Sequence, residues 1–218
     1  MPTAYFDLDK TLLAVNSASL WVKSELRAGH IGWLTAARAA TWIGRYHLGM
    51  ASMDHAVLRA IASLKGQDEQ LIANRTHDFW HTEVEHRVRP GAWDALARHR
   101  DAGDRLVLLT SSSVYLSQLA QEHMGLDAIL CNRFEVQDGV FTGRPEGPLC
   151  FGAGKLDHAL ADAMASGEPL EQASFYTDSH SDVPVLDAVA RPVVVHPDPR
   201  LKRHAAARGW PVQDWGSV

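Results

Sequence analysis

Two aspartates stand two residues apart near the start of the chain, in the stretch YFDLDKTLL that runs from Tyr5 to Leu13. In an extended segment Asp7 and Asp9 point to the same face, because side chains alternate along a strand. Two neighbouring carboxylates repel each other, and one is driven to hold a proton unless a cation lies beside it. A divalent cation would remove this repulsion, and the remaining motifs decide whether one belongs here.

Further polar residues follow later apolar runs or open a predicted helix. Thr110 and Ser111 follow LVLL, Asp178 follows SFYT with Asp182 four residues later, and Lys155 follows FGAG. Carboxylates, a hydroxyl and a lysine suit phosphoryl transfer, because oxygen ligands hold Mg²⁺ while donors and a cation stabilise the phosphoryl oxygens. One carboxylate can attack phosphorus to form an aspartyl-phosphate, while its neighbour acts as an acid and then as a base.

The elements that must position these residues alternate between strand and helix. Apolar runs predict strands up to residue 6 and at 105–110, 173–178 and 192–197, and helical periodicity predicts helices at 90–104, 114–125, 155–167, 182–190 and 198–209. The alternation implies a parallel sheet covered on both faces, a doubly wound, Rossmann-like α/β fold. Ligands bind at the carboxyl ends of strands in such sheets, where the polar residues fall.

The segment from Ser17 to about Glu85 differs, because its pattern is helical throughout. We expect an α-helical cap inserted after the first strand, with residues 15–86 in the cap and residues 1–14 and 87–218 in the catalytic core. Asp138-Gly139 lies between two short apolar runs and predicts a small β-hairpin.

The composition excludes several classes of protein. A chain of 218 residues is one large domain, or a core with a smaller inserted domain. The net charge of −5 argues against a nucleic-acid binder, and two cysteines fit a reducing compartment. No signal peptide is visible, and the most apolar helical stretch is too short to span a bilayer. We expect a cytoplasmic protein without stable membrane insertion, and its oligomeric state stays open.

Four motifs together resemble a known family. DLDKT, the apolar run ending in Thr110, Lys155 in GAGK, and DSHSD with the proline and leucine after it resemble the ordered motifs of the haloacid dehalogenase-like (HAD) phosphatases. The resemblance covers almost the whole chain, including the DGVFTG hairpin. It is closest to the branch with a helical cap after the first motif, similar to phosphoserine phosphatase. Each motif alone has an ordinary explanation, such as a helix cap or a polar loop, but their order makes the set specific.

The resemblance implies catalytic roles. Asp7 would be the nucleophile and Asp9 the acid and base. Thr110 would donate to the phosphoryl group, and Lys155 would balance the charge of Asp7 and the phosphate. The sequence LLTSSS leaves Thr110 and Ser111 open as the donor, and counting from the end of the apolar run favours Thr110.

The resemblance also implies the metal ligands. Mg²⁺ would be held by Asp7, by the backbone carbonyl of Asp9 and by Asp178. Asp182 would bind it through a water molecule, or would contact the direct ligands without binding the metal itself. Thr11 would orient the loop around Asp9.

The leaving group is less well defined. In phosphoserine phosphatases a glutamate shortly after the first motif meets the amino group of the substrate, and Asn16 stands at that place here. The loss of the charge argues against phosphoserine. Related enzymes act on histidinol phosphate, phosphorylated amino alcohols or lysophospholipids. We therefore predict a Mg²⁺-dependent phosphatase for a small phosphomonoester, with Asn16 and Ser17 as candidate substrate contacts.

Other interpretations stay open. Phospho-accepting signalling proteins also combine an aspartate, a hydroxyl and a lysine, but their aspartate ends a later strand and they lack a helical insertion. A catalytically idle binding protein on the same fold is another alternative. His77 and His81 in HDFWH have the spacing of a zinc pair, although one face of a helix explains them more simply.

Apolar residues of the cap would suit a lysophospholipid, although at helical spacing such residues more often form the core of the helices themselves. They are Trp21, Trp33, Trp42, Tyr46, Met50, Met53, Phe79 and Trp80, with Arg38 and Arg45 as candidate contacts for membrane phosphates.

Overall fold

The computed structural model describes residues 1–35, 37, 41 and 53–217. Five residues that the lipid hypothesis named lie outside the described residues, namely Arg38, Trp42, Arg45, Tyr46 and Met50.

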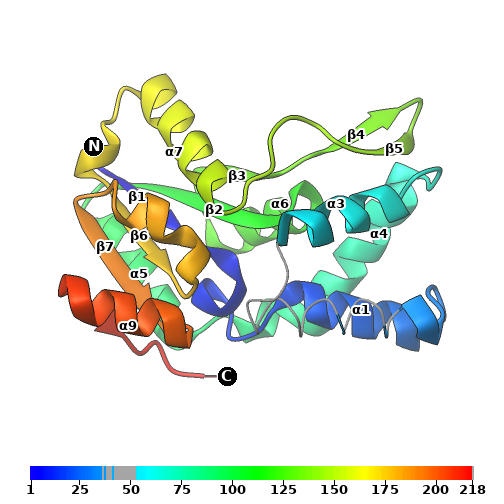
Figure 1. Cartoon of the computed structure of the whole chain (residues 1–218), viewed down its shortest axis with the longest axis horizontal. Coiled ribbons are helices and arrows are strands. Elements are labelled where there is room, and N and C mark those ends of the chain that lie inside the picture. Colours follow the sequence, from blue (N-terminus) through cyan, green and yellow to red (C-terminus); the bar gives the residue numbers. More distant parts are fainter. Residues whose placement is uncertain (36, 38–40, 42–52, 218) are drawn as a thin grey trace.

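The described elements follow the predicted alternation of strands and helices (Figure 1). The strands are β1 (Thr3–Phe6), β2 (Arg105–Ser113), β3 (Ala128–Asn132), β4 (Phe134–Gln137), β5 (Val140–Pro145), β6 (Ser174–Thr177), β7 (Arg191–Val195) and β8 (Val212–Gln213). The α-helices are α1 (Ser17–Arg27), α3 (Met53–Ser63), α4 (Glu69–Phe79), α5 (Pro90–Asp101), α6 (Val114–Met124), α7 (Ala153–Ser166), α8 (Val183–Leu186) and α9 (Pro199–Arg208). Short helical turns are η1 (Leu8–Leu12), η2 (Trp80–Val84), η3 (Glu85–Arg87), η4 (Leu170–Gln172) and η5 (His180–Asp182).

Six strands form one parallel sheet in the order β3-β2-β1-β6-β7-β8. Strand β1 is central, with Phe6 opposite Leu108 of β2 and Tyr176 of β6. The carboxyl ends of β1, β2 and β6 therefore lie side by side, which is where a doubly wound sheet binds its ligand. The predicted α/β fold is confirmed.

Alternate residues of each strand pack on opposite faces of the sheet. Phe6 and Leu108 join a core cluster with residues of α5 and α6, whereas Tyr5 and Val107 join a second cluster with residues of α7, α8 and α9. Strands that are buried on both faces explain the continuous apolar runs of the sequence.

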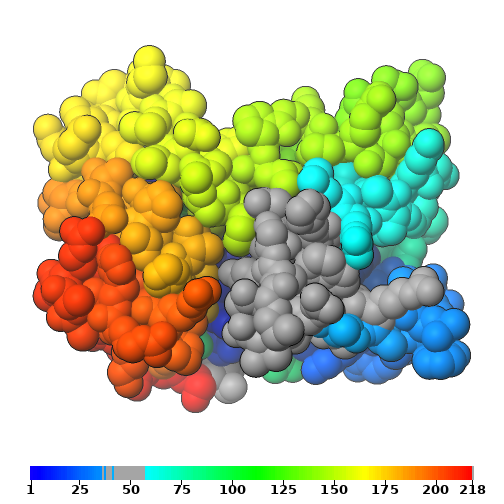
Figure 2. Space-filling model, viewed as in Figure 1, coloured from blue at the N-terminus to red at the C-terminus, as the bar shows by residue number. Residues whose placement is uncertain are grey.

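The helices α1, α3 and α4 lie between β1 and β2 in the chain and beside the sheet in space (Figure 1). The hairpin β4–β5 turns through Asp138 and Gly139, which have φ angles of 51° and 77°, as a two-residue turn requires. The hairpin packs against α3. It is also bonded to the start of α4, because Glu69 N donates to Gly139 O at 2.8 Å. Figure 2 shows hairpin and α3 on one side of the molecule and α7 to α9 on the other.

Two predicted elements have different lengths in the structure. Strand β2 continues to Ser113, three residues beyond the predicted end at Thr110. The helix expected over 182–190 is shorter in the structure: α8 ends at Leu186, and turns at 187–190 lead to Arg191, which pairs with Ser174 in the sheet. Among the helices of the described residues, none is long and apolar enough to cross a membrane.

Candidate active site

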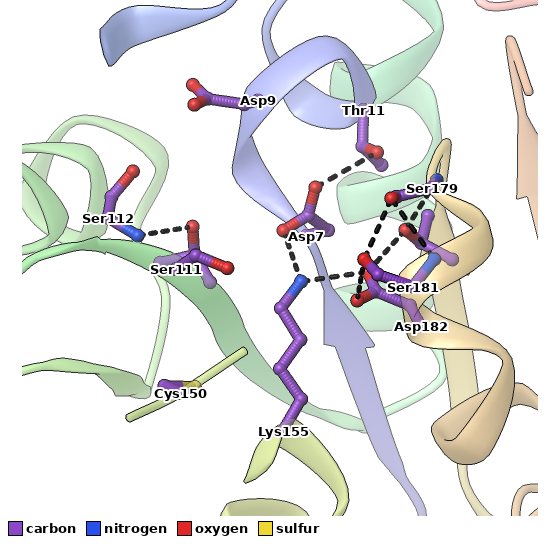
Figure 3. A network of polar contacts seen from close by, with 12 residues as sticks. Asp7, Asp9, Thr11, Ser111, Ser112, Cys150, Lys155, Ser179, Ser181 and Asp182 are labelled. Atoms are coloured by element: carbon purple, nitrogen blue, oxygen red, sulfur yellow. Dashed lines mark hydrogen bonds and ion pairs between the residues drawn. The ribbon is translucent and has the colours of Figure 1, made fainter. Parts of the chain in front are cut away.

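The chain turns sharply where β1 ends. Asp7 N donates to Tyr176 O at 2.9 Å, which keeps Asp7 in line with the strand, and the turn η1 follows at once. Within this turn Lys10 has a φ angle of 60°, a conformation that side chains seldom adopt. Arg89 Nε supports it by donating to Lys10 O at 3.3 Å. Because the segment is not extended, the predicted shared direction of Asp7 and Asp9 is not observed, and Figure 3 shows the Asp9 carboxylate pointing away from Asp7.

Lys155 joins two carboxylates that are far apart in the sequence (Figure 3). Its Nζ donates to Asp7 Oδ1 at 2.7 Å and to Asp182 Oδ2 at 2.8 Å. Thr177 Oγ1 also donates to Asp182 Oδ2, at 2.7 Å, and Thr11 Oγ1 donates to Asp7 Oδ2 at 3.5 Å. The fractional exposures of Asp7, Lys155 and Asp182 are 6%, 2% and 1%, so the cluster lies inside the protein.

Glycines in the segment before α7 bring Lys155 to this place. Gly152 has a φ angle of 53°, and a Cβ on Gly154 would lie 2.1 Å from the carbonyl oxygen of Leu149. A side chain at Gly154 would collide with that backbone, so the FGAGK sequence is needed for the close turn that starts the helix.

Burial and unbalanced negative charge raise the pKa values of the carboxyl groups. Burial raises the pKa of Asp7 to about 7; Lys155 opposes the shift, while Asp182 and Asp9 add to it. Burial, and then the charge of Asp7, raise the pKa of Asp178 well above its usual range. Burial alone would lower the pKa of Lys155, but Asp182 and Asp7 outweigh it and raise that pKa. Lysine therefore stays charged here while the carboxyl groups attract a further positive charge.

Asp9 contacts the beginning of α1. Its Oδ1 accepts from Ser17 N at 2.9 Å and its Oδ2 from Asn16 Nδ2 at 3.3 Å. Asn16 Oδ1 caps the helix by accepting from Ser19 N at 2.9 Å. Both polar groups of Asn16 thus have partners within the protein, and the assignment of Asn16 and Ser17 as substrate contacts stays a prediction.

Thr110 and Ser111 lie at the carboxyl end of β2. Thr110 has a fractional exposure of 1%, whereas Ser111 is half-buried. Thr110 Oγ1 accepts from Ser112 N at 3.2 Å, so its own hydroxyl proton remains able to donate. The alternative of Thr110 or Ser111 as phosphoryl donor remains a prediction.

The donor set fits Mg²⁺ better than a metal held entirely by side chains. Within the described part of the chain, no three His, Cys, Asp or Glu side chains are arranged as a metal site. Mg²⁺ commonly uses one or two carboxylates and completes its ligands with water and phosphate oxygens. Asp7 and Asp178 provide such carboxylates, and burial is the main cause of their raised pKa values, which a bound cation would lower. Asp182 fits less well as a direct ligand, because its Oδ2 already accepts from Lys155 and Thr177.

The histidine pair in HDFWH has ordinary surface contacts. The rings of His77 and His81 have centroids 4.5 Å apart, and His81 Nδ1 lies 2.7 Å from Glu85 Oε2. Both histidines are exposed.

Three residues near the site have no signal in the sequence. Thr177 supports Asp182, Arg89 supports the turn at Lys10, and Asn132 bonds to Ser111. Thr177 was only one residue of the strand predicted over 173–178, and neither Arg89 nor Asn132 stands in a motif. Their contacts arise from segments distant in the chain, which residue spacing cannot predict.

The family described as haloacid dehalogenase-like hydrolase matches residues 4–187. The chain belongs to this family. The matched range includes each residue of the cluster around Lys155, so the predictions of the family and of an HAD-type phosphatase or hydrolase are confirmed.

Several relatives are similar over nearly the whole chain. The Inhibition of morphological differentiation protein of Streptomyces azureus is 32% identical, over 97% of this chain and 78% of its own length. Phosphoserine phosphatase SerB1 of Mycobacterium tuberculosis is 29% identical, over 97% and 70%. Histidinol-phosphatase of Neisseria meningitidis serogroup C is 27% identical, over 96% of each protein.

A solved structure has the same fold along its whole length. The crystal structure of a protein of unknown function from Bordetella pertussis Tohama I has a TM-score of 0.90 and 30% identity, and the match covers 99% of both chains. The match therefore extends over the sheet, the helices between β1 and β2 and the hairpin.

Proposed function

We propose that the protein is a Mg²⁺-dependent phosphatase that hydrolyses a small phosphomonoester through an aspartyl-phosphate on Asp7. The observation that carries the proposal is the buried cluster in which Lys155 donates to both Asp7 and Asp182 at the carboxyl edge of the sheet. The cluster offers a nucleophile, a fixed cation and a second carboxylate, Asp178, in one place, as phosphoryl transfer needs.

The nucleophile is held in a defined orientation. Lys155 binds Asp7 Oδ1, while Oδ2 has only the long contact of 3.5 Å with Thr11. We assign the attack to Oδ2: it forms the bond to phosphorus as the bond to the leaving-group oxygen breaks. Lys155 stabilises the ionised form of Asp7 and the charge on the phosphoryl oxygens, and the Thr110 hydroxyl donates to one of them.

Asp9 donates a proton in the first step and accepts one in the second. Its acid form protonates the leaving alkoxide, and its carboxylate then takes a proton from the water that attacks phosphorus. Attack of this water breaks the bond between phosphorus and Asp7 Oδ2 and releases phosphate. Burial raises the pKa of Asp9, which favours the protonated form required for the first step. Asn16 and Ser17, which bond to Asp9, set the position of this group.

Asp7, Asp178 and the backbone carbonyl of Asp9 would hold the metal. When bound, Mg²⁺ supplies positive charge to the phosphoryl oxygens and to the neighbouring carboxylates.

The helices of residues 15–86 would form a cap that recognises the leaving group and excludes water during the reaction. Relatives named phosphoserine phosphatase and histidinol-phosphatase support a small polar phosphomonoester. Asn16 argues against phosphoserine, as its neutral side chain offers no charge to an amino group. The two cysteines are free and buried, which supports our proposal that the enzyme acts in the cytoplasm.

Phosphate release from a panel of phosphomonoesters tests the function. The panel contains histidinol phosphate, phosphoserine, phosphoethanolamine, glycerol phosphate, lysophosphatidate and an aryl phosphate, each with Mg²⁺ and with chelator. We expect Mg²⁺-dependent release, with one small ester far above the others and phosphoserine below it. Stable phosphorylation without release would indicate a signalling protein, and no reaction with any ester would indicate a binding protein.

A further inference from the structure

Strand β2 departs from regular pairing at the segment that follows its apolar run. Leu109 pairs with Leu130 of β3, but the next pair is Ser113 with Asn132. Three residues of β2, Thr110 to Ser112, thus stand opposite a single residue of β3. Such a bulge leaves backbone groups without ladder partners, and a buried carbonyl without a partner is costly.

The side chain of Asn132 replaces the missing ladder bond. Asn132 Nδ2 donates to Ser111 O at 2.6 Å, within the bulge. Its Oδ1 accepts from Cys150 N at 2.8 Å. Asn132 has a fractional exposure of 2% and Cys150 is fully buried, so water is poorly placed to substitute for either bond.

The two backbone groups belong to two different parts of the site. Ser111 directly follows Thr110, the proposed phosphoryl donor. Cys150 opens the glycine-containing turn that ends at Lys155. One buried amide therefore connects the segment that carries the donor to the segment that carries the cation of the cluster.

We infer that Asn132 is a positioning residue for the reaction, which sets the distance between the Thr110 hydroxyl and the Lys155 ammonium. This inference rests on the proposed phosphatase function. Asn132 acts through these two segments and not as a substrate contact, because its side chain is buried and both ends of its amide are bonded within the protein. An asparagine is required because the site needs one donor and one acceptor in the same plane, and neither leucine nor aspartate at neutral pH supplies both.

Asn132→Asp and Asn132→Ala test the inference with the phosphomonoester that the wild type hydrolyses fastest. We expect kcat per folded molecule to fall roughly 10- to 100-fold in both variants, because small displacements of catalytic groups have effects of this size. Asp127→Ala is the matched control, since Asp127 Oδ2 accepts from Leu106 N at 2.7 Å and ties β2 to the start of β3 at the opposite end. The control should lose thermal stability and keep its kcat.

A pH profile separates positioning from a merely structural role. Protonated aspartate has a donor and an acceptor, as asparagine does, so the activity of Asn132→Asp relative to wild type should recover as the pH falls. Asn132→Ala should show no such recovery. An active wild type with unchanged kcat in both variants would overturn this inference alone. A wild type that releases no phosphate would overturn the proposed function, and the inference with it.

Discussion

The cluster around Asp7 and the helices between β1 and β2 use charge differently. Lys155 and Asp182 are almost fully buried, and their ion pair joins residues 27 positions apart. Arg27 and Glu83 form an equally close pair of 2.6 Å between α1 and η2, but the Arg27 side chain is 62% exposed. Solvent weakens such a surface pair, whereas a buried charge without its partner is strongly unfavourable.

This difference implies different uses. The buried cluster holds charged groups in one arrangement, and burial together with neighbouring carboxylates raises the pKa values of Asp7 and Asp178. The Arg27–Glu83 pair can break at little cost because it is exposed, which suits a cap that must admit and release a substrate. Four experiments test how far this contrast holds.

Removal of the nucleophile should have the largest effect. Asp7→Asn should lower kcat by about a thousandfold or more, because the amide cannot form the bond to phosphorus. Steady-state phosphate release measures the loss, and circular dichroism checks that the protein is folded. We expect folding to survive, since Lys155 still has Asp182. Activity near the wild-type level would exclude Asp7 as the nucleophile.

Loss of the buried cation should cost far more stability than loss of a surface cation. Lys155→Met should lower the free energy of unfolding by about 3–5 kcal/mol, because it leaves Asp7 and Asp182 buried without their partner. Arg27→Ala, the matched change in the surface pair, should cost about 0–1 kcal/mol. Urea denaturation of both variants without Mg²⁺ gives the comparison. Equal losses would contradict the contrast between the two regions.

Mg²⁺ should stabilise the enzyme more at high pH than at low pH. The folded-state pKa of Asp7 is raised from 3.8 to about 7, so the stability that this proton gives is complete below the unfolded value and is lost as the pH rises through 7. Mg²⁺ takes the place of the proton only when the carboxyl group is ionised. We expect the increase in Tm with Mg²⁺ to be small at about pH 5 and larger at about pH 8.

Asp178→Asn is the control for this experiment, because the variant lacks one proposed ligand and should show little increase in Tm at either pH. The same increase for wild type at both values would argue against a metal bound by these carboxylates.

The smallest effect on kcat is expected at Asn16, which bonds to Asp9 and caps α1. Asn16→Ala should lower kcat about three- to tenfold, since Asp9 loses one of its two hydrogen bonds, and KM should change little. The helix cap is lost as well, at a cost of about 1 kcal/mol. Asp68→Ala removes the equivalent cap of α4, where Asp68 accepts from Leu71 N, and should lower stability without lowering kcat. A change confined to KM would instead support the prediction that Asn16 contacts the substrate.

The sequence alone determined the order of the elements and the candidates Asp7, Asp178 and Lys155. Strands buried on both faces read as continuous apolar runs, so a polar residue at the end of a run marks the ligand-binding edge of the sheet. Asp138-Gly139 likewise determined the hairpin turn, because its backbone conformation is a local property of those two residues.

Only the tertiary structure decided how these residues meet. The turn at Lys10 directs Asp9 toward α1, although the spacing of the two aspartates predicted a shared direction with Asp7. Lys155 reaches Asp7 across 148 positions of sequence, and Asn132 joins two segments that no motif connects. Periodicity and spacing report the local backbone, whereas these contacts depend on which strands become neighbours in the sheet and where the ladder bulges.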